Sequence, residues 1–175
     1  MTSTETTVPA TSLSRERTDL LESLGRHRFF HRFTVRELTD EQAAQRPTAS
    51  ALCLGGLIKH VTETEQQWMD FAVGGGRAMA AGASEVDWNS RFDMAPGDTL
   101  AGLLERYDEV ARRTDDLVGT LDLDADHALP EAPWFEPGAR WSVRRVVLHV
   151  IAETAQHAGH ADIIRETIDG QKTMG

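Results

Sequence analysis

Apolar side chains recur at intervals of three or four residues through four long segments of this chain, and this spacing restricts the possible folds more than any other feature. The segments cover approximately residues 14–38, 53–73, 98–121 and 142–170. Such spacing places side chains on one face of an α-helix. We find no convincing alternation of period two, which would indicate strands, and no internal repeat. Four amphipathic helices can bury their apolar faces against one another, so the sequence predicts an all-α four-helix bundle.

Several residues predict where the helices begin and end. Thr34 and Val35 could mark a break near the end of the first segment. Ser142, and either Asp98 or Thr99, are suited to the N-cap of a helix because their side chains can accept a hydrogen bond from a free backbone N–H. Gly74–Gly76 is expected to end the second helix, and Gly170 the fourth, because glycine readily adopts the left-handed conformation found at helix ends.

Two long connections are predicted, at about residues 77–97 and 122–140. Both are longer than adjacent antiparallel helices require, so some helices are expected to be joined by crossovers, and the connections could form a lid or a pocket wall. Trp68, within the second helix, is expected in the core. The tryptophans expected at a pocket mouth are Trp88, Trp134 and Trp141.

Length and charge narrow the class of protein. The chain has 175 residues, enough for one domain with its own core, which we expect over residues 13–175 after a disordered tail at 1–12. Its 18 Lys and Arg against 28 Asp and Glu give a formal charge of −10, which disfavours nucleic-acid binding. One cysteine, Cys53, excludes an internal disulfide. No targeting segment or long apolar run is visible, so we expect a cytoplasmic protein without a membrane partner.

Three polar residues interrupt the apolar faces of the second and fourth helices. Glu153 and His157 lie four residues apart among Val and Ala positions, and His60 lies between Leu57 and Thr64. A carboxylate in this register would be buried, and a metal ion would compensate its charge while satisfying both imidazoles. Two histidines and one glutamate are the ligands of open catalytic zinc sites. We therefore favour zinc, while iron(II), nickel and manganese also suit these ligands.

Each of these residues also has a simpler interpretation. Glu153 and His157 could form an ordinary pair on a helix surface, and His60 could be a hydrogen-bonded core histidine. His149 and His160 lie close to the pair in sequence, and His160 suits a group that supports a ligand or transfers a proton. The two histidines of the first helix, His27 and His31, could line the same cavity, although a polar end of the core is the favoured interpretation.

Three segments carry a resemblance to the DinB-like superfamily, and within it to the actinobacterial branch related to mycothiol-dependent maleylpyruvate isomerase. They are LGGLIKHVTETEQQW at residues 54–68, WSVRRVVLHVIAETAQHAGHADIIRE at 141–166, and LTDEQAAQRP at 38–47. The resemblance covers nearly the whole chain after the first residues. It implies a four-helix bundle that holds a divalent metal.

The resemblance also implies which residues act. The metal ligands would be His60, Glu153 and His157, and the glutamate at 153 is the feature that favours the isomerase-related branch. His160 becomes a candidate catalytic residue for proton transfer. The implied co-substrate is a low-molecular-weight thiol, mycothiol, used for S-transfer to a small electrophile or for its isomerisation, and a homodimer is possible.

Two other functions remain open on the sequence. One is a non-catalytic, metal-binding stress-response module, which a closed shell of four ligands would favour. The other is a metal-dependent hydrolase, in which His160 would be the nearby base for a bound water.

Overall fold

The computed structural model describes residues 13–81 and 88–174, so the tail expected at residues 1–12 lies outside the described residues. The long helices are α1 (Arg15–Phe33), α3 (Leu54–Ala81), α4 (Leu100–Thr120) and α5 (Val143–Asp169). The shorter elements are α2 (Asp40–Ala43), the 3-10 helix η1 (Trp88–Phe92), β1 (Asp126–Ala128) and β2 (Arg140–Ser142). The all-α bundle that the sequence predicts is confirmed.

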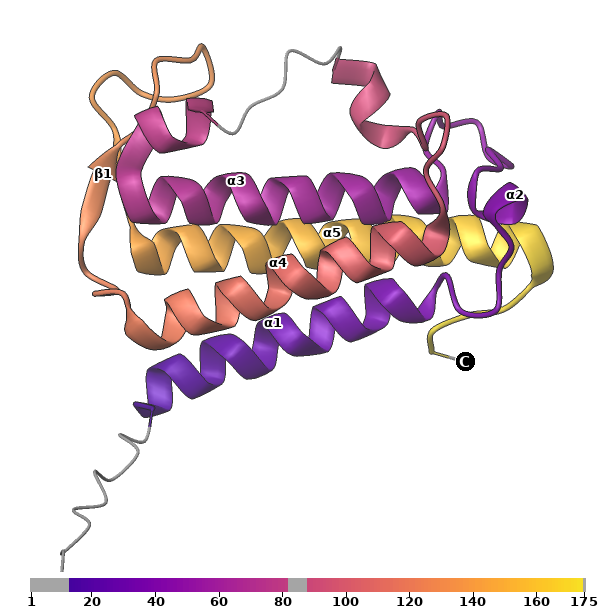
Figure 1. Ribbon diagram of the computed structural model, residues 1–175, viewed down its shortest axis with the longest axis horizontal. Coiled ribbons are helices and arrows are strands. Elements are labelled where there is room, and N and C mark those ends of the chain that lie inside the picture. The colour runs from indigo at the N-terminus through magenta and orange to yellow at the C-terminus, as the bar shows by residue number, and fades with distance from the viewer. Residues whose placement is uncertain (1–12, 82–87, 175) are drawn as a thin grey trace, which may run out of the picture.

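The four long helices form a ring of neighbours (Figure 1). α1 packs against α4 and α5, and α3 packs against the same two helices from the other side. α1 and α5 run in one direction, whereas α3 and α4 run in the other. The chain therefore crosses the length of the bundle between the end of α3 and the start of α4, which confirms the expected crossover.

The predicted caps begin and end these helices. The side chains of Thr99 and Ser142 accept hydrogen bonds from the backbone N–H groups of Gly102 and Arg145, each three residues into its helix. Gly170 ends α5 in the left-handed conformation, with φ 78°. These residues place the starts of α4 and α5 where the sequence predicts them.

α1 ends at Phe33, which confirms the break expected at Thr34 and Val35, so the helix is shorter than the periodic segment that reaches residue 38. The guanidinium of Arg165 on α5 donates to the backbone carbonyls of Thr34 and Arg36, at 2.8 and 2.7 Å. Glu37 then adopts a positive φ of 59°, which an α-helix does not allow. A distant arginine therefore satisfies the carbonyls at this helix end.

α3 continues past the glycine triplet, where the sequence predicts its end. Gly75 has φ 69° and ψ −164°, so the helix axis breaks there and a further helical segment runs to Ala81. A Cβ on Gly75 would lie 3.2 Å from Nδ1 of His127, so the His127 side chain, which comes from β1, fits closely against the break in α3. The interruption was predicted correctly, but the helical turn after it was not.

A small hairpin in the last connection was also not predicted. β1 and β2 pair antiparallel, with Asp126 opposite Ser142 and Ala128 opposite Arg140. Strands of three residues are too short to show an alternating pattern in the sequence. We call residues 129–139, which the two strands enclose, the hairpin connection.

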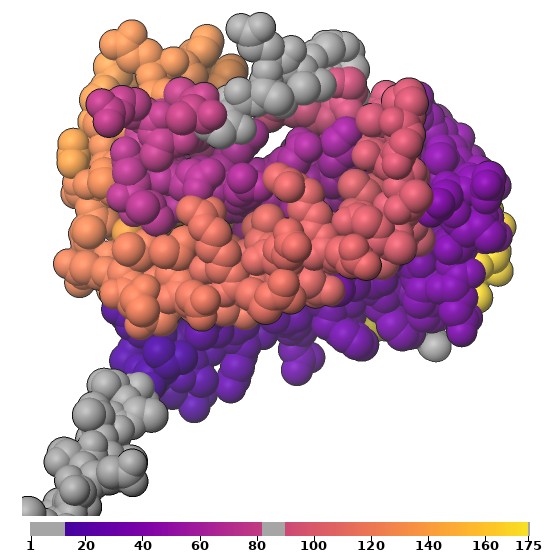
Figure 2. All heavy atoms as spheres, in the orientation of Figure 1, coloured from indigo at the N-terminus to yellow at the C-terminus, as the bar shows by residue number. Residues whose placement is uncertain are grey.

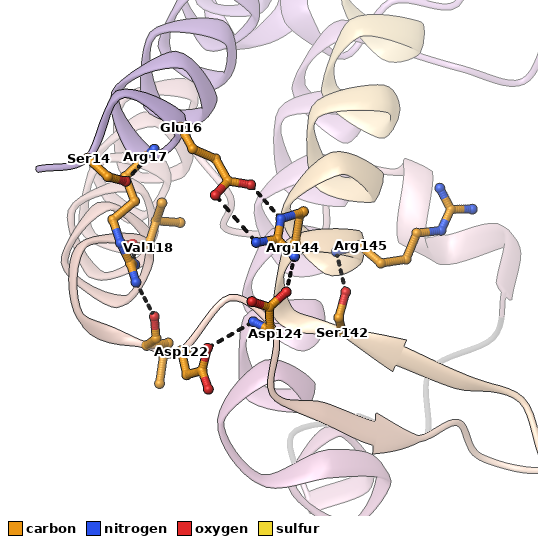
Figure 3. A network of polar contacts seen from close by, with 10 residues as sticks. Ser14, Glu16, Arg17, Val118, Asp122, Asp124, Ser142, Arg144 and Arg145 are labelled. Carbon is orange, nitrogen blue, oxygen red and sulfur yellow. Dashed lines mark hydrogen bonds and ion pairs between the residues drawn. The ribbon is translucent and has the colours of Figure 1, made fainter.

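Polar contacts hold this hairpin against the bundle (Figure 3). Arg144, at the start of α5, pairs with Glu16 of α1 and with Asp124, just before β1. Arg17 of α1 donates to the backbone carbonyls of Val118 and Leu121 at the end of α4. The first turns of α1 and α5 and the last turn of α4 are therefore joined at one end of the molecule.

The core consists of two clusters of buried apolar side chains, one towards each end of the bundle. The first joins residues of α3, α4 and α5, among them Leu57, Val61, Tyr107 and Ile164. The second includes Met69, Phe71, Val118 and Val146. On the face seen in Figure 2, α4 extends across the molecule above α1, and the hairpin connection rises beside the end of α3.

Candidate metal centre

His60, Glu153 and His157 lie together between α3 and α5. Each offers a nitrogen or carboxylate oxygen, and these atoms all lie within 4.8 Å of one another. The two imidazole rings are 4.8 Å apart at 75°, and Nε2 of His157 lies 3.7 Å from a carboxylate oxygen of Glu153. Because α3 packs against α5, residues 93 positions apart in sequence become neighbours. We call this group the His60–Glu153–His157 cluster.

Glu153 is less buried than the sequence predicts. Its side chain is 28% exposed, while the adjacent Thr154 is fully buried and donates its hydroxyl to the carbonyl of Val150. The uncharged threonine therefore occupies the core position, and the carboxylate lies at its edge. Partial burial still raises the pKa of the Glu153 carboxyl above its usual value.

Both imidazoles of the cluster are shielded from water. Burial lowers the pKa of His60 to about 4, with a further effect of the nearby His157 and Arg91. Burial likewise lowers the pKa of His157 to about 4, with a further effect of His160. Both rings are therefore neutral at pH 7, which is the form that can donate a lone pair to a metal.

His160 lies behind His157 rather than within the cluster. The Nδ1 atoms of these two rings are 3.4 Å apart, whereas Nε2 of His157 is the nitrogen nearest Glu153. A hydrogen bond at Nδ1 fixes the ring orientation and leaves Nε2 available as a ligand. His160 does not line the cavity described below.

Phe92 covers the ring of His60. Their ring centroids are 4.2 Å apart at 32°, and Phe92 lies at the end of η1. A glycine on α3 permits this approach, because a Cβ on Gly56 would lie only 1.7 Å from the backbone oxygen of Phe92. The role of Gly56 depends on this contact with a distant segment, so no local pattern in the sequence indicates it.

A cavity of about 380 Å³ opens beside the cluster. Its lining comes from α3, α5, Arg91 and the hairpin connection with the start of β2. The lining residues include His60, Thr64, Gln67, Trp68, Trp134, Phe135, Trp141, His149 and Glu153. Trp134 and Trp141 thus lie at a cavity, as the sequence predicts, whereas the side chain of Trp88 lies outside the described residues.

Trp68 packs against the second core cluster, as predicted, and its side chain also lines this cavity. Its ring stacks on Trp141 at 4.7 Å and 17°, and the neighbouring Met69 takes the fully buried position. His149 contacts both indoles edge to face and lies 3.8 Å from the Glu153 carboxylate. His149 therefore faces the cavity, beside the Glu153 carboxylate.

The remaining histidines lie outside the cluster. His31 on α1 is fully buried, and neither ring nitrogen has a hydrogen-bond partner among the described residues. His127 in β1 lies 3.2 Å from the carbonyl oxygen of Ala72 and packs against Phe71, so it supports the break in α3. His27 contacts Phe30 on its own helix.

Comparison with known protein families identifies where this chain belongs. No helix among the described residues is long and apolar enough to cross a membrane. No curated protein matches the sequence. The family model described as mycothiol-S-transferase matches residues 19–170, a range that contains the complete cluster and every lining residue of the cavity. Because this match spans most of the 175 residues, the chain belongs to the mycothiol-S-transferase family.

Proposed function

We propose that this protein is a metal-dependent enzyme that joins a low-molecular-weight thiol, mycothiol, to a small electrophile. One observation carries the proposal: in a member of the mycothiol-S-transferase family, the His60–Glu153–His157 cluster lies beside a cavity large enough for a small molecule. The cavity gives a substrate access to the cluster.

The residues fit a divalent ion. Two neutral imidazoles and one carboxylate supply nitrogen and oxygen ligands, and the partly exposed Glu153 places its carboxylate at the cavity. Zinc is favoured for this set, and iron(II), nickel and manganese bind the same groups. When bound with one open position, such an ion lowers the pKa of a thiol so that the nucleophilic thiolate forms near neutral pH.

The surrounding side chains complete the reaction. We assign the thiol proton to His149, whose imidazole lines the cavity and whose pKa is lowered by burial, so that it is neutral and can accept a proton. We assign to His160 the role of a positioning residue that holds His157 through Nδ1, in place of the direct proton transfer expected from the sequence.

The proposed transfer balances as follows. The thiolate sulfur donates an electron pair to an electrophilic carbon and an S–C bond forms. The leaving group departs with the pair of its former bond to carbon. If the acceptor is instead a conjugated double bond, the thiol adds across it, and its later elimination returns the pair to sulfur and releases an isomer. The same cavity residues serve both outcomes.

Metal content and turnover together test the proposal. The full chain, purified without added metal, is expected to contain close to one equivalent of a divalent metal, and a His60→Ala variant is expected to lose most of it. A His27→Ala variant is the matched control, because His27 is a partly buried histidine outside the cluster. Equal metal in all three proteins would contradict the assigned ligands.

Turnover distinguishes the transferase from the rival functions. The wild-type protein is expected to consume mycothiol and an alkyl or aryl halide in equal amounts, and to stop when either is omitted. Hydrolysis of an ester without thiol would instead indicate the hydrolase. A metal-loaded protein that forms no thiol adduct with any electrophile would indicate a binding module.

A further inference from the structure

The cavity beside the cluster has walls of unequal chemistry. From the hairpin connection it receives Pro130, Ala132, Trp134 and Phe135, whose side chains offer apolar surface and a single indole N–H. From α3 it receives Thr64 and Gln67, which can hydrogen-bond to hydroxyl groups. We call the four residues from the hairpin connection, together with Trp141, the aromatic wall. A substrate with one flat apolar part would fit against it.

The base of the aromatic wall is fixed by packing. Trp141 stacks on Trp68 and has the guanidinium of Arg145 4.8 Å from its ring centroid. Phe135 meets Trp141 edge to face, with 5.8 Å between centroids. These contacts involve α3, α5 and the hairpin connection, so the rings do not depend on a ligand for their positions.

The hairpin connection is itself well restrained. The backbone N–H of Leu129 donates to Ala139 at 2.9 Å, which continues the pairing of β1 with β2. The N–H of Phe135 donates to Ala132 at 3.1 Å, and prolines at 130, 133 and 137 fix φ. A preformed wall can bind a rigid ligand without the loss of conformational entropy that ordering a flexible loop requires.

Trp134 is the unusual member of this wall. Its side chain is 77% exposed, although it lines the cavity and touches Phe135 edge to face at 6.2 Å. An indole left in water at a cavity rim offers a large π surface at little cost in conformational entropy. Its face is available to a second ring, whereas Trp68 and Trp141 each use one face in stacking on the other.

We propose that the electrophile accepted by this protein is a planar aromatic compound, bound with its ring against Trp134 and Phe135, and that the hairpin connection determines this selectivity. The inference rests on the proposed function and adds the class of acceptor to it. With an activated aryl halide, the thiolate sulfur forms a bond to the ring carbon and the halide leaves with the electron pair of the carbon–halogen bond. The thiol proton passes to the base at the cavity and then to solvent.

The difference in polarity between the aromatic wall and the α3 side favours the electrophile, rather than the thiol, as the group that binds at the aromatic wall. A thiol that carries hydroxylated rings needs hydrogen-bonding partners, and those lie on the α3 side at Thr64 and Gln67. The aromatic wall supplies few hydrogen-bonding groups. The electrophile and the thiol would thus occupy different sides of one cavity, each next to the His60–Glu153–His157 cluster.

A binding experiment tests the wall without any turnover. We would measure the dissociation constant of 2,4-dinitrophenol, a planar ring without a leaving group, by calorimetry on the full chain in EDTA and without thiol. A Trp134→Ala substitution is expected to weaken binding about tenfold, and Trp134→Phe to restore most of it. Phe29→Ala, which removes another exposed aromatic ring from α1, is the control and should leave binding unchanged. No binding by wild type, or equal binding by Trp134→Ala, would overturn the proposal.

Kinetics with two electrophiles then test selectivity. Trp134→Ala is expected to lower kcat/KM about tenfold for 1-chloro-2,4-dinitrobenzene and less than twofold for iodoacetamide, which is small and aliphatic. Equal losses for both, or a raised KM for mycothiol with both electrophiles unaffected, would overturn the assignment. If wild type turns over neither electrophile but binds 2,4-dinitrophenol through Trp134, the proposed function fails while the aromatic wall stands.

Discussion

His31 is expected to make the free energy of unfolding of this protein fall as the pH becomes acidic. Its ring is fully buried between α1 and α4, with Tyr107 edge to face at 6.2 Å, and neither nitrogen has a hydrogen-bond partner among the described residues. Burial lowers the pKa of this imidazole from 6.5 to about 3, with smaller effects of His157 and His60. The native protein therefore holds His31 neutral at a pH where the unfolded chain protonates it.

The sign and size of the effect follow from that difference. Between pH 6.5 and 3 the unfolded state binds one more proton at this residue, so the free energy of unfolding falls as the pH falls. With these two pKa values, the loss of unfolding free energy relative to pH 8 is about 1 kcal/mol at pH 5.5 and about 3 kcal/mol at pH 4.5. It approaches a limit of about 5 kcal/mol below pH 3.

A His31→Phe substitution isolates this contribution, because phenylalanine keeps a ring against Tyr107 and cannot titrate. Urea unfolding of both proteins in EDTA, at pH 8, 5.5 and 4.5, gives the difference between their free energies of unfolding. We expect the variant to gain about 3 kcal/mol on wild type between pH 8 and 4.5. The other buried groups titrate in both proteins and cancel. Parallel pH curves, or a wild type that loses less than the variant, would refute the reasoning.

Two further predictions concern close packing and buried charge. A Gly56→Ala substitution must displace the backbone at Phe92, so we expect it to lower the free energy of unfolding by about 1–3 kcal/mol and to weaken metal retention. As a control, Gly25→Ala on an exposed face of α1 should raise the free energy of unfolding by about 0.5–1 kcal/mol. Equal effects of the two substitutions on urea unfolding would contradict the contact with Phe92. Arg28→Ala leaves the fully buried carboxylate of Glu65 without its partner and should lower the free energy of unfolding by about 3–5 kcal/mol. The double variant Arg28→Met, Glu65→Leu should recover most of that loss. A single variant as stable as the double variant would show that the charge of Glu65 is compensated by another group.

Much of the fold could be predicted because it depends on local information. The starts of α4 and α5 and the end of α5 coincide with the capping residues Thr99, Ser142 and Gly170, whose effect reaches only a few neighbours. The sequence indicated a break at Thr34 and Val35, but it could not show the contact made there by Arg165, which lies 131 residues from Thr34 in sequence. Contacts of this kind leave no periodic signal in the segment that they reshape.

The site shows the same division. Spacing alone put His60, Glu153 and His157 on inward faces, and the structure brings them together. Spacing could not separate a core position from a cavity position one residue away, and for that reason it placed Glu153 at the depth that Thr154 has in the structure. Successive helical residues differ by about 100° in direction, and a cavity wall presents as much apolar surface as a core.

The position of Glu153 explains how one helix serves both stability and chemistry. Full burial of an ionised carboxylate without a partner would cost several kcal/mol, and the fully buried position beside it is held by Thr154, which needs no ion. The apolar clusters on either side of the site contain none of the three cluster residues, so the bundle is held together by side chains that do not contact a metal. On the proposed function, an ion held by the cluster would be reached by a thiol from the cavity, which His60 and Glu153 line. Catalytic zinc sites leave one position to water or substrate, whereas structural zinc sites have four protein ligands.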